Sequence, residues 1–400
     1  MVTAIVNARV FDGERTLGTP TVVIDGTSVS AVGGEVPTGA EVLDASGATL
    51  LPGLIDAHTH TNEESLALAL RFGVTTELEM QGTHTAANRA HIADNDEVAD
   101  VRSAGFAITP PGGHPAELFP KGFVRPGGDR PFASTPEEAT ALVAKLAESG
   151  SDYIKFMIDD GSVEGHPGLP MLDQATVDAG VAEAHRHGLL AVAHALTIDT
   201  TRMAIDAGID GLAHLFMDRP HTSEIISLIA RSGVFVVPCV VMNASLTGIT
   251  GADLADDPRV DARLNDAWRD TLRSSFNRYP QGSIPDVLAS ALALHQAGVD
   301  LLVGSDAAAP VPFLGGLAHG ASVHRELRYL VEAGLTPAEA LRAATSTAAR
   351  RFALHDRGRI APGQRADLLL VSGDPTASIS ATLDIRAVWR RGTPLKWTFQ

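Results

Sequence analysis

Two histidines one residue apart, His58 and His60, follow an apolar run at residues 49–55. Such a run predicts a strand, and alternate side chains of a strand share a face, so Asp56, His58 and His60 are expected to project together. Imidazole is a common ligand for zinc and related divalent ions, and two imidazoles on one rigid strand lose little freedom on binding. The pair predicts a metal site, although His-X-His pairs also occur in solvated or purely structural positions.

Lys155 lies in the middle of another apolar run, residues 153–158. Alternation places Tyr153, Lys155 and Met157 on one face of the expected strand. A bare ammonium group would be costly to bury and would be repelled by divalent cations. Carboxylation of the neutral amine by carbon dioxide would remove both problems. The alternative is a lysine that reaches solvent from the strand end or pairs with an acid.

His194, His214 and Asp306 each end a strand-like run. Histidines at such positions are metal-ligand candidates, but each alone is also compatible with a satisfied core or surface histidine. Asp306 can ligate a metal and accept a proton from water, or it can cap the following helix.

Eight strand-like runs alternate with helix-like segments, and this order predicts an α/β fold, a (β/α)8 TIM barrel with its catalytic groups at the carboxyl ends of the strands. After the run ending at residue 55, the others are 73–80, 105–109, 153–158, 189–194, 211–215, 234–241 and 299–306. Residues 135–146 are typical of the intervening helices, with a threonine cap and an early proline.

Both ends of the chain contain short strand-like runs and are expected to build one small β-sandwich domain. The predicted boundaries are 1–52 and 359–400 for this domain and 53–358 for the barrel. The long segment 242–298 between the last two strands, with a helix expected at 266–276, is expected either to serve as a lid or pocket wall or to be a decorative insertion.

The composition is that of an ordinary globular protein, with 44% hydrophobic and 20% charged residues in 400. A formal charge of −17 argues against a nucleic-acid partner. The single cysteine, Cys239, cannot form an internal disulfide and is expected to be a buried core thiol. No secretory signal or membrane-spanning run is visible, so we expect a cytoplasmic enzyme without membrane contact. The oligomeric state is left open, and a homo-oligomer is allowed.

The segment Pro52-Gly-Leu-Ile-Asp-Ala-His-Thr-His60, the segments 340–350 and 358–368, and the order of the six candidate ligands resemble the amidohydrolase superfamily. The resemblance is to its binuclear members with a carboxylated lysine, and it extends over essentially the whole chain. It implies that His58, His60 and Asp306 hold one divalent ion and that His194 and His214 hold a second. Carboxylated Lys155 would bridge the ions, for which zinc is the best match. The resemblance further implies hydrolysis by a metal-activated bridging hydroxide, whose proton Asp306 accepts and passes to the leaving group.

The runs 109–114 and 319–327 resemble the branch that contains Xaa-Pro dipeptidases and imidazolonepropionase-like hydrolases. This implies that His114 and His319 contact a small-molecule substrate, although His114 also suits a structural turn and His319 a solvated loop. Those peptidases often carry Met-Ala-Ser-Gly-Gly after the lysine, whereas here Met157 is followed by Ile-Asp-Asp-Gly-Ser. Asp159 and Asp160 would repel a substrate carboxylate.

We therefore expect hydrolysis of an amide-type C–N bond in a neutral or cationic N-acyl compound, peptide-like compound, carbamate or cyclic amide. Lactone, ester or phosphotriester hydrolysis would use the same ligands. Deamination is a less favoured alternative, because it usually needs one metal and no lysine at the fourth strand. A metal-holding scaffold without turnover is disfavoured, because the acid/base and ligand set is complete.

Overall fold

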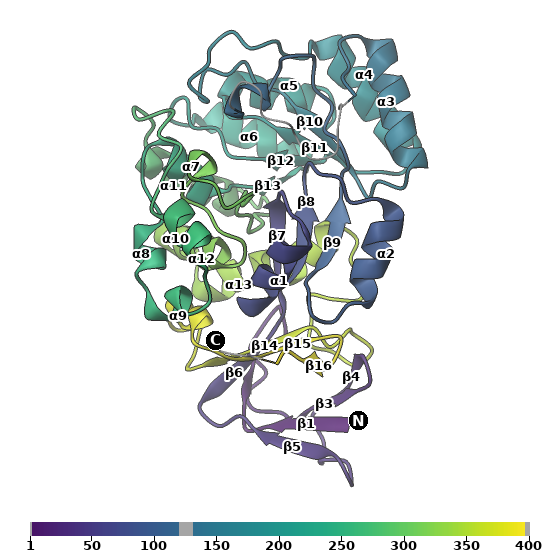
Figure 1. Cartoon of the computed structure of the whole chain (residues 1–400), viewed down its shortest axis with the longest axis vertical. Coiled ribbons are helices and arrows are strands. Elements are labelled where there is room, and N and C mark those ends of the chain that lie inside the picture. The colour runs from purple at the N-terminus through teal and green to yellow at the C-terminus, as the bar shows by residue number, and fades with distance from the viewer. Residues whose placement is uncertain (1, 120–130, 397–400) are drawn as a thin grey trace.

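The computed structural model describes residues 2–119 and 131–396 of the chain. It is a mixed α/β structure (Figure 1), in which a larger part contains parallel strands flanked by helices and a smaller part contains mostly antiparallel strands. The metal-site candidates all belong to the larger part.

Two parallel sheets form the centre of the larger part. One sheet has the order β7-β8-β9 and the other the order β10-β11-β12-β13. The strands are β7 (Leu54–Thr59), β8 (Val74–Glu79), β9 (Asp100–Ser103), β10 (Ile154–Met157), β11 (Ala191–His194), β12 (Gly211–Ala213) and β13 (Phe235–Val237). Every residue of these strands is buried except Arg102, which fits the nearly continuous apolar runs expected of parallel strands covered on both faces.

Three isolated parallel bridges extend the two sheets at their edge strands. Ile108 pairs with Phe156 on β10, and Leu301 pairs with Val236 on β13. A third bridge joins Ala307 to Thr59 on β7. Residues 301–307 therefore pair with one edge strand of each sheet, β13 and β7, and Ile108 pairs with β10 at the other edge of the second sheet.

Helices follow most of these strands along the chain. Those in the first part are α1 (Glu63–Arg71), α2 (Ala86–Asp94), α3 (Pro136–Glu148), α4 (Gln174–Arg186), α5 (Ile198–Asp206) and α6 (Ser223–Ser232). Those after β13 are α7 (Val240–Leu246), α8 (Ala252–Ala255), α9 (Pro258–Asp261), α10 (Asp266–Leu272), α11 (Ile284–Gln296), α12 (Ala321–Ala333), α13 (Pro337–Ala343) and α14 (Ser346–Arg351). Three short 3-10 helices are η1 (Ala116–Leu118), η2 (Pro312–Leu314) and η3 (Ile379–Leu383).

The smaller part combines both ends of the chain in two sheets, with the orders β4-β3-β1-β5 and β16-β15-β14-β6-β2. The strands are β1 (Val2–Val6), β2 (Arg9–Val10), β3 (Val22–Asp25), β4 (Ser28–Val32), β5 (Glu41–Asp44), β6 (Ala48–Pro52), β14 (Leu368–Ser372), β15 (Ile385–Arg390) and β16 (Thr393–Pro394). Side chains of both sheets, such as Ile24 and Leu370, share one hydrophobic cluster. β6 pairs with β14 over five residues, so the first and last parts of the chain are hydrogen-bonded together.

A buried cluster of charges joins the smaller part to the amino end of β9. We call it the junction cluster, and it consists of Asp100, Arg357, Arg365, Asp367 and Arg390. The Oδ2 atom of Asp100 forms ion pairs with Arg357 at 2.5 Å and with Arg365 at 3.1 Å. Burial raises the pKa of Asp100, but Arg357 and the other arginines lower it more. The pKa of Asp100 is therefore well below its usual range. Each carboxylate in the cluster is thus matched by guanidinium groups.

The expected α/β class and the helix at 135–146 are confirmed. Thr135 caps α3 through the Glu138 N–H, and proline lies in its first turn. The third strand was misplaced: it is β9 at 100–103, because Gly105 turns with a φ of 68° and leaves only Ile108 of the predicted run paired. The predicted strand at 299–306 is reduced to one isolated bridge, at Leu301, and its last residue, Asp306, leaves the extended conformation. Across the described residues, no helix combines the length and apolarity needed to cross a membrane.

Candidate metal centre

His58, His60 and Asp306 converge at the carboxyl end of β7. The Nε2 atoms of His58 and His60 lie 3.2 and 3.0 Å from one carboxylate oxygen of Asp306, Oδ1. Ligand atoms held at about 2.0–2.1 Å by a tetrahedral zinc ion lie about 3.3 Å from one another. The spacing of these three side chains therefore fits the binding of one divalent ion.

Backbone contacts set the position of Asp306. Its N–H donates to the carbonyl of His58 at 2.8 Å, and its φ of 57° lies in the left-handed region. The preceding residue, Ser305, donates its N–H and its hydroxyl to the carboxylate of Asp56 at 2.9 and 2.5 Å. Burial, together with the nearby Glu77, raises the pKa of Asp56 to about 7. Asp56 thus anchors the turn that presents Asp306 to the histidines.

Hydrogen bonds orient two of the histidine rings. The Nδ1 of His60 lies 3.0 Å from the carbonyl of Gln81, so an Nδ1–H donor leaves Nε2 free as a ligand. The Nε2 of His194 lies 2.9 Å from Asp159 Oδ2, which leaves its Nδ1 free. A carboxylate or carbonyl behind a histidine is the usual arrangement around protein-bound metals.

Lys155 lies on β10 with its side chain fully buried. Its Nζ has no hydrogen-bond partner among the described residues. Burial lowers the pKa of Lys155 to about 7, against the opposing influence of Asp306. A substantial fraction of this amine is therefore neutral near pH 7, and the neutral amine is the form that reacts with carbon dioxide.

His214 follows β12 and completes the group. Its ring stacks on that of His58 with 4.5 Å between centroids, and the His194 ring lies 4.9 Å away. The Nδ1 atoms of His58 and His214 are buried and lack a partner in the described part of the chain. Burial lowers the pKa of His58 to about 3 and that of His214 well below its usual range, so both rings are neutral, as metal binding requires.

The pairing register explains why residues distant in sequence meet here. Met157 pairs with His194, and His194 pairs with Ala213, the neighbour of His214, so the ends of β10, β11 and β12 lie at one level. All six predicted ligands are brought into one region. Their unpartnered nitrogens and convergent oxygens fit divalent ions better than a set of internal hydrogen bonds.

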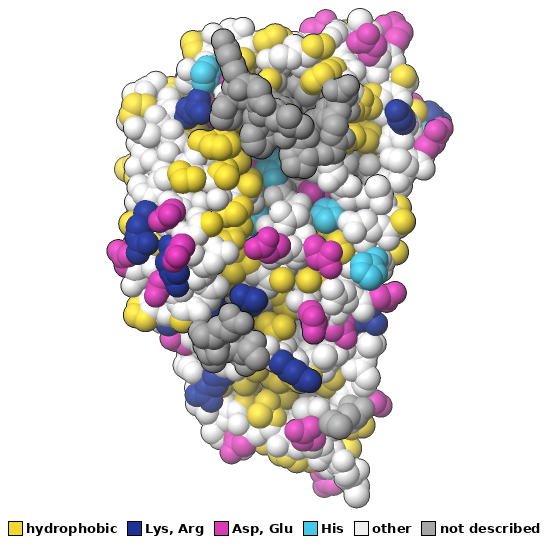
Figure 2. Space-filling model, viewed as in Figure 1, with side chains coloured by type: hydrophobic (Ala, Val, Ile, Leu, Met, Phe, Trp, Pro, Cys, Tyr) yellow, Lys and Arg dark blue, Asp and Glu magenta, His cyan; other side chains and the backbone are white. Residues whose placement is uncertain are grey.

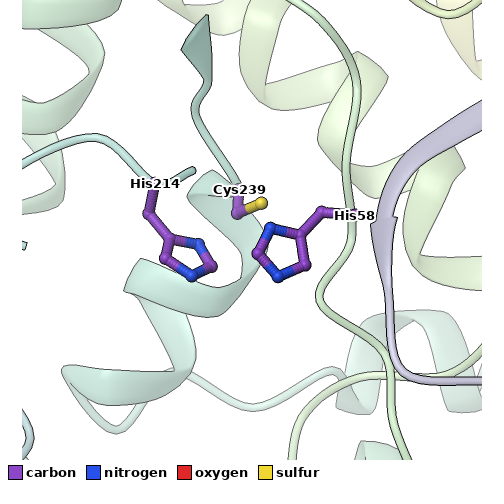
Figure 3. Close-up of side chains that lie close together, drawn as sticks. All are labelled: His58, His214 and Cys239. Atoms are coloured by element: carbon purple, nitrogen blue, oxygen red, sulfur yellow. The ribbon is translucent and has the colours of Figure 1, made fainter. Parts of the chain in front are cut away.

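Cys239 is buried, as expected, yet it lies beside the centre (Figure 3). It precedes α7 with a φ of 48°, and its sulfur is near enough to nitrogens of His58 and His214 for the three to share an ion. Glu326 supports this turn by accepting the N–H groups of Val240 and Val241 at 3.0 and 2.9 Å. Cys239 lies inside the predicted run 234–241, and its place next to the metal-site candidates goes beyond the expected role of a core thiol.

A cavity of about 130 Å³ opens onto the candidate ligands. Histidine side chains are visible in the corresponding hollow, beside an area of hydrophobic side chains (Figure 2). Met242 and Phe276 supply part of the wall, so the long segment 242–298 includes pocket-wall residues. A cavity of about 150 Å³ holds one benzene molecule, so the enclosed part of a ligand is a small group.

His114 lines this cavity and stacks on His194 with 4.3 Å between ring centroids. Its Nδ1 is 2.6 Å from Glu117 Oε1. Burial opposes protonation, but the hydrogen bond to Glu117 and the nearby Glu164 raise the pKa of His114 to about 9. Glu164 also lines the cavity; it and Asp159 were not among the predicted site residues, although both follow the β10 run closely.

His319 lies apart from the cavity walls described above. It is fully buried, with Nδ1 2.8 Å from Glu77 and Nε2 2.8 Å from the carbonyl of Ala308. The expectation of a solvated loop histidine is therefore wrong, because both ring nitrogens are used inside the protein. A substrate contact by His319 has no support in this geometry.

Known proteins share sequence and fold with this chain. A family model described as "Amidohydrolase family" matches residues 49–395. An allantoinase of Solibacter usitatus is 30% identical over 420 residues, covering 92% of this chain and 84% of that protein. A solved Xaa-Pro dipeptidase with bound methionine superimposes with a TM-score of 0.77 at 23% identity, covering 99% of this chain and 100% of that one. Molinate hydrolase gives a TM-score of 0.76 at 21% identity, covering 99% and 94%.

The chain belongs to the amidohydrolase family, and it is a hydrolase of that family. The solved structures, at these identities, show the shared fold.

Proposed function

We propose that this protein is a metal-dependent hydrolase that cleaves an amide-type C–N bond in a small molecule. The convergence of His58, His60 and Asp306 beside a buried, unpartnered Lys155 carries the proposal. The family assignment and the allantoinase relative support it. The substrates we consider are N-acyl and peptide-like compounds, carbamates and cyclic amides.

The fold proposed for this function is a (β/α)8 barrel. The two parallel sheets and the bridges at Ile108, Leu301 and Ala307 support it. The two sheets around one hydrophobic cluster support a β-sandwich domain from residues 1–52 and 359–400, with the barrel at 53–358.

We assign two divalent ions, zinc by preference, to the six side chains. His58, His60 and Asp306 would hold one ion, and His194 and His214 would hold the other. Lys155, carboxylated on Nζ, would be a ligand of both ions. Bound divalent ions lower the pKa of water and polarise a substrate carbonyl.

The chain's own groups handle orientation and protons. Asp306 is placed to accept a proton from attacking water and deliver it to the leaving nitrogen. Asp56 and Ser305 hold its turn, and the carbonyl of Gln81 and the carboxylate of Asp159 orient His60 and His194. The apolar wall at Met242 and Phe276 limits water around the reacting group.

Metal content and lysine chemistry test the assignment without a known substrate. We expect about two equivalents of metal per chain, and a carbamate carbon signal by NMR after loading with ¹³C-bicarbonate. Lys155→Ala should lose metal and the signal, whereas Lys145→Ala, at an exposed position of α3, should keep both. One equivalent of metal together with normal turnover in Lys155→Ala would refute the binuclear assignment.

Cys239 provides a second check on the ligand set, because its sulfur lies close to His58 and His214. If the six residues named above are the ligands, Cys239→Ala retains the full metal content. Loss of one equivalent in this variant would make the thiol a ligand and require a revised assignment.

The reaction class requires a substrate screen. N-acyl amino acids, dipeptides, cyclic amides, carbamates, lactones and aminated heterocycles should be compared for product formation. Cleavage of amide-type members is the expected result. Ammonia release without acid formation would indicate deamination, and turnover of lactones alone would indicate an esterase-type activity.

A further inference from the structure

Glu164 is a buried carboxyl group without a hydrogen-bond partner in the described residues. Its residue is 4% exposed, and that small exposed part lines the cavity. It lies in the loop between β10 and α4. Burial of a polar group without a partner costs roughly 1–3 kcal/mol, more when the group is charged, so such groups usually have one.

The neighbouring acids behave differently. Asp159 accepts the N–H of Gly161 at 2.6 Å and pairs with His194. Glu117 pairs with His114 at 2.6 Å. Asp159 and Glu117 therefore have hydrogen-bond partners, whereas Glu164 has none in the described residues, although its carboxylate lies within 4.8 Å of ring nitrogens of His114 and His194.

Outside the metal centre, the imidazole of His114 is the cationic group on the described wall, and Glu117 and Glu164 already lie beside it. Lys155 is the sole lysine or arginine among the described lining residues, and it lies in the metal centre. Beyond the candidate ligands, the wall includes apolar side chains such as Leu118, Met157 and Leu314. The formal charge of −17 gives the whole molecule a field that attracts cations and repels anions.

We propose that Glu164 is a specificity-determining residue that binds a basic nitrogen of the substrate, an ammonium or similar cationic N–H group. The inference rests on the proposed function, because C–N hydrolysis at the metal centre sets where the scissile bond of the substrate lies. It deepens that function, since the substrate carries a cationic group on the side of the cavity where His114 stacks on His194. A carboxylate at the same place would meet both Glu164 and Glu117, which already neighbour the single imidazole of His114.

Three matched substrates test the proposal on the holoenzyme: N-acetylated diaminobutane, N-pentylacetamide and acetamidopentanoate. They share the amide and nearly the same length but end in a cation, a methyl group and an anion. We expect kcat/KM to fall in that order. Glu164→Gln should lose at least about tenfold on the cation, the size of a hydrogen bond to a charged group, and change little on the neutral compound.

Glu117→Gln is the matched control, because it removes a carboxylate from the same cluster without removing the one on the wall. It should affect all three substrates alike, through His114. An equal loss on all three substrates in Glu164→Gln would overturn the specificity role. Loss of a metal equivalent in this variant would also overturn it and make Glu164 a ligand.

A binding experiment separates this inference from the proposed reaction. Pentylamine should bind the metal-loaded protein more tightly than pentanoate by calorimetry, and Glu164→Gln should abolish the difference. Selective binding of the amine without cleavage of any amide would refute the reaction and leave the role of Glu164 intact. Cleavage with no preference between amine and carboxylate would refute the role of Glu164 alone.

Discussion

The metal centre and the junction cluster are both buried and rich in charged or ionisable groups, yet their polar atoms are used differently. In the junction cluster, Asp100 contacts several arginines, and Arg390 Nε is the exception without a partner among the described residues. In the metal centre, Lys155 Nζ and the Nδ1 atoms of His58 and His214 are unpartnered. Paired buried charges indicate a structural joint, whereas unpaired ones indicate a site completed by a ligand.

The largest expected effect is on turnover. Asp306→Asn keeps the shape of the side chain but removes the proton acceptor and one ligand oxygen. We expect kcat to fall roughly a thousandfold with little loss of thermal stability. Steady-state kinetics and a melting curve measure the two quantities. Retained turnover would contradict the contrast between the metal centre and the junction cluster, because the carboxylate of Asp306 would then be structural.

The junction cluster should give the opposite pattern. Asp100→Asn leaves buried arginines without their anion, so we expect the free energy of unfolding to fall by about 3–5 kcal/mol. Metal content and kcat of the folded protein should stay within about twofold of the wild type. Chemical denaturation measures the loss.

Asp199→Asn serves as control for that variant. It breaks the Arg219 pair, in which both side chains are well exposed, and should cost less than about 1 kcal/mol. A similar small cost for Asp100→Asn would show that the junction cluster contributes little stability.

Asp56→Asn sharpens the comparison, because Asp56 is fully paired yet belongs to the metal centre. Loss of its carboxylate loosens the turn of Ser305 and Asp306, so we expect a ten- to hundredfold loss in kcat/KM or in metal affinity. Asp44 is a matched control, since it accepts the N–H and hydroxyl of Ser46 in the same way on an exposed turn. Asp44→Asn should leave kinetics and metal content unchanged. Equal behaviour of the two variants would contradict a positioning role for Asp56.

The smallest effect concerns pH and a third buried polar site. Burial lowers the pKa of His324 from 6.5 to about 4, although its bond to the Phe72 carbonyl opposes this. The unfolded chain therefore binds the proton more readily, and the free energy of unfolding falls as pH decreases from 6.5 towards 4. The loss is about 2 kcal/mol at pH 5.

Denaturation curves at several pH values compare His324→Gln with the wild type and with His355→Gln at an exposed position. The first variant should lack this part of the pH dependence, and the second should retain it. An unchanged slope in His324→Gln would assign the acid sensitivity to other groups.

Local patterns made much of the fold and site predictable. The helix α3 and the strand β8 follow from caps and apolar runs within a few residues. Five of the six candidate ligands follow from residue type at the ends of apolar runs, because parallel strands bring those ends to one level, and Lys155 follows from its place within such a run. These signals need no knowledge of distant contacts.

Other features depend on contacts between distant segments. The third strand starts at Asp100 because that residue pairs with Thr76 and meets the arginines of the junction cluster, which no local pattern encodes. Glu164 and Cys239 reach the site through loop geometry, and the burial of His319 depends on Glu77, far away in sequence. A single sequence gives such residues no distinguishing period or motif.

The pairing of Thr59 with Ala307, beside the bond from Asp306 to His58, has a consequence for biosynthesis. Two of the three convergent ligands emerge from the ribosome early, and the third emerges almost 250 positions later, so no chain that ends before residue 306 possesses the centre. Contacts between residues so far apart in sequence form slowly, because the chain loses the entropy of closing a large loop before these contacts can stabilise it. Enzymatic activity in a cell-free translation reaction therefore reports completed chains, and it should trail the synthesis of residue 306 by the time needed for closure.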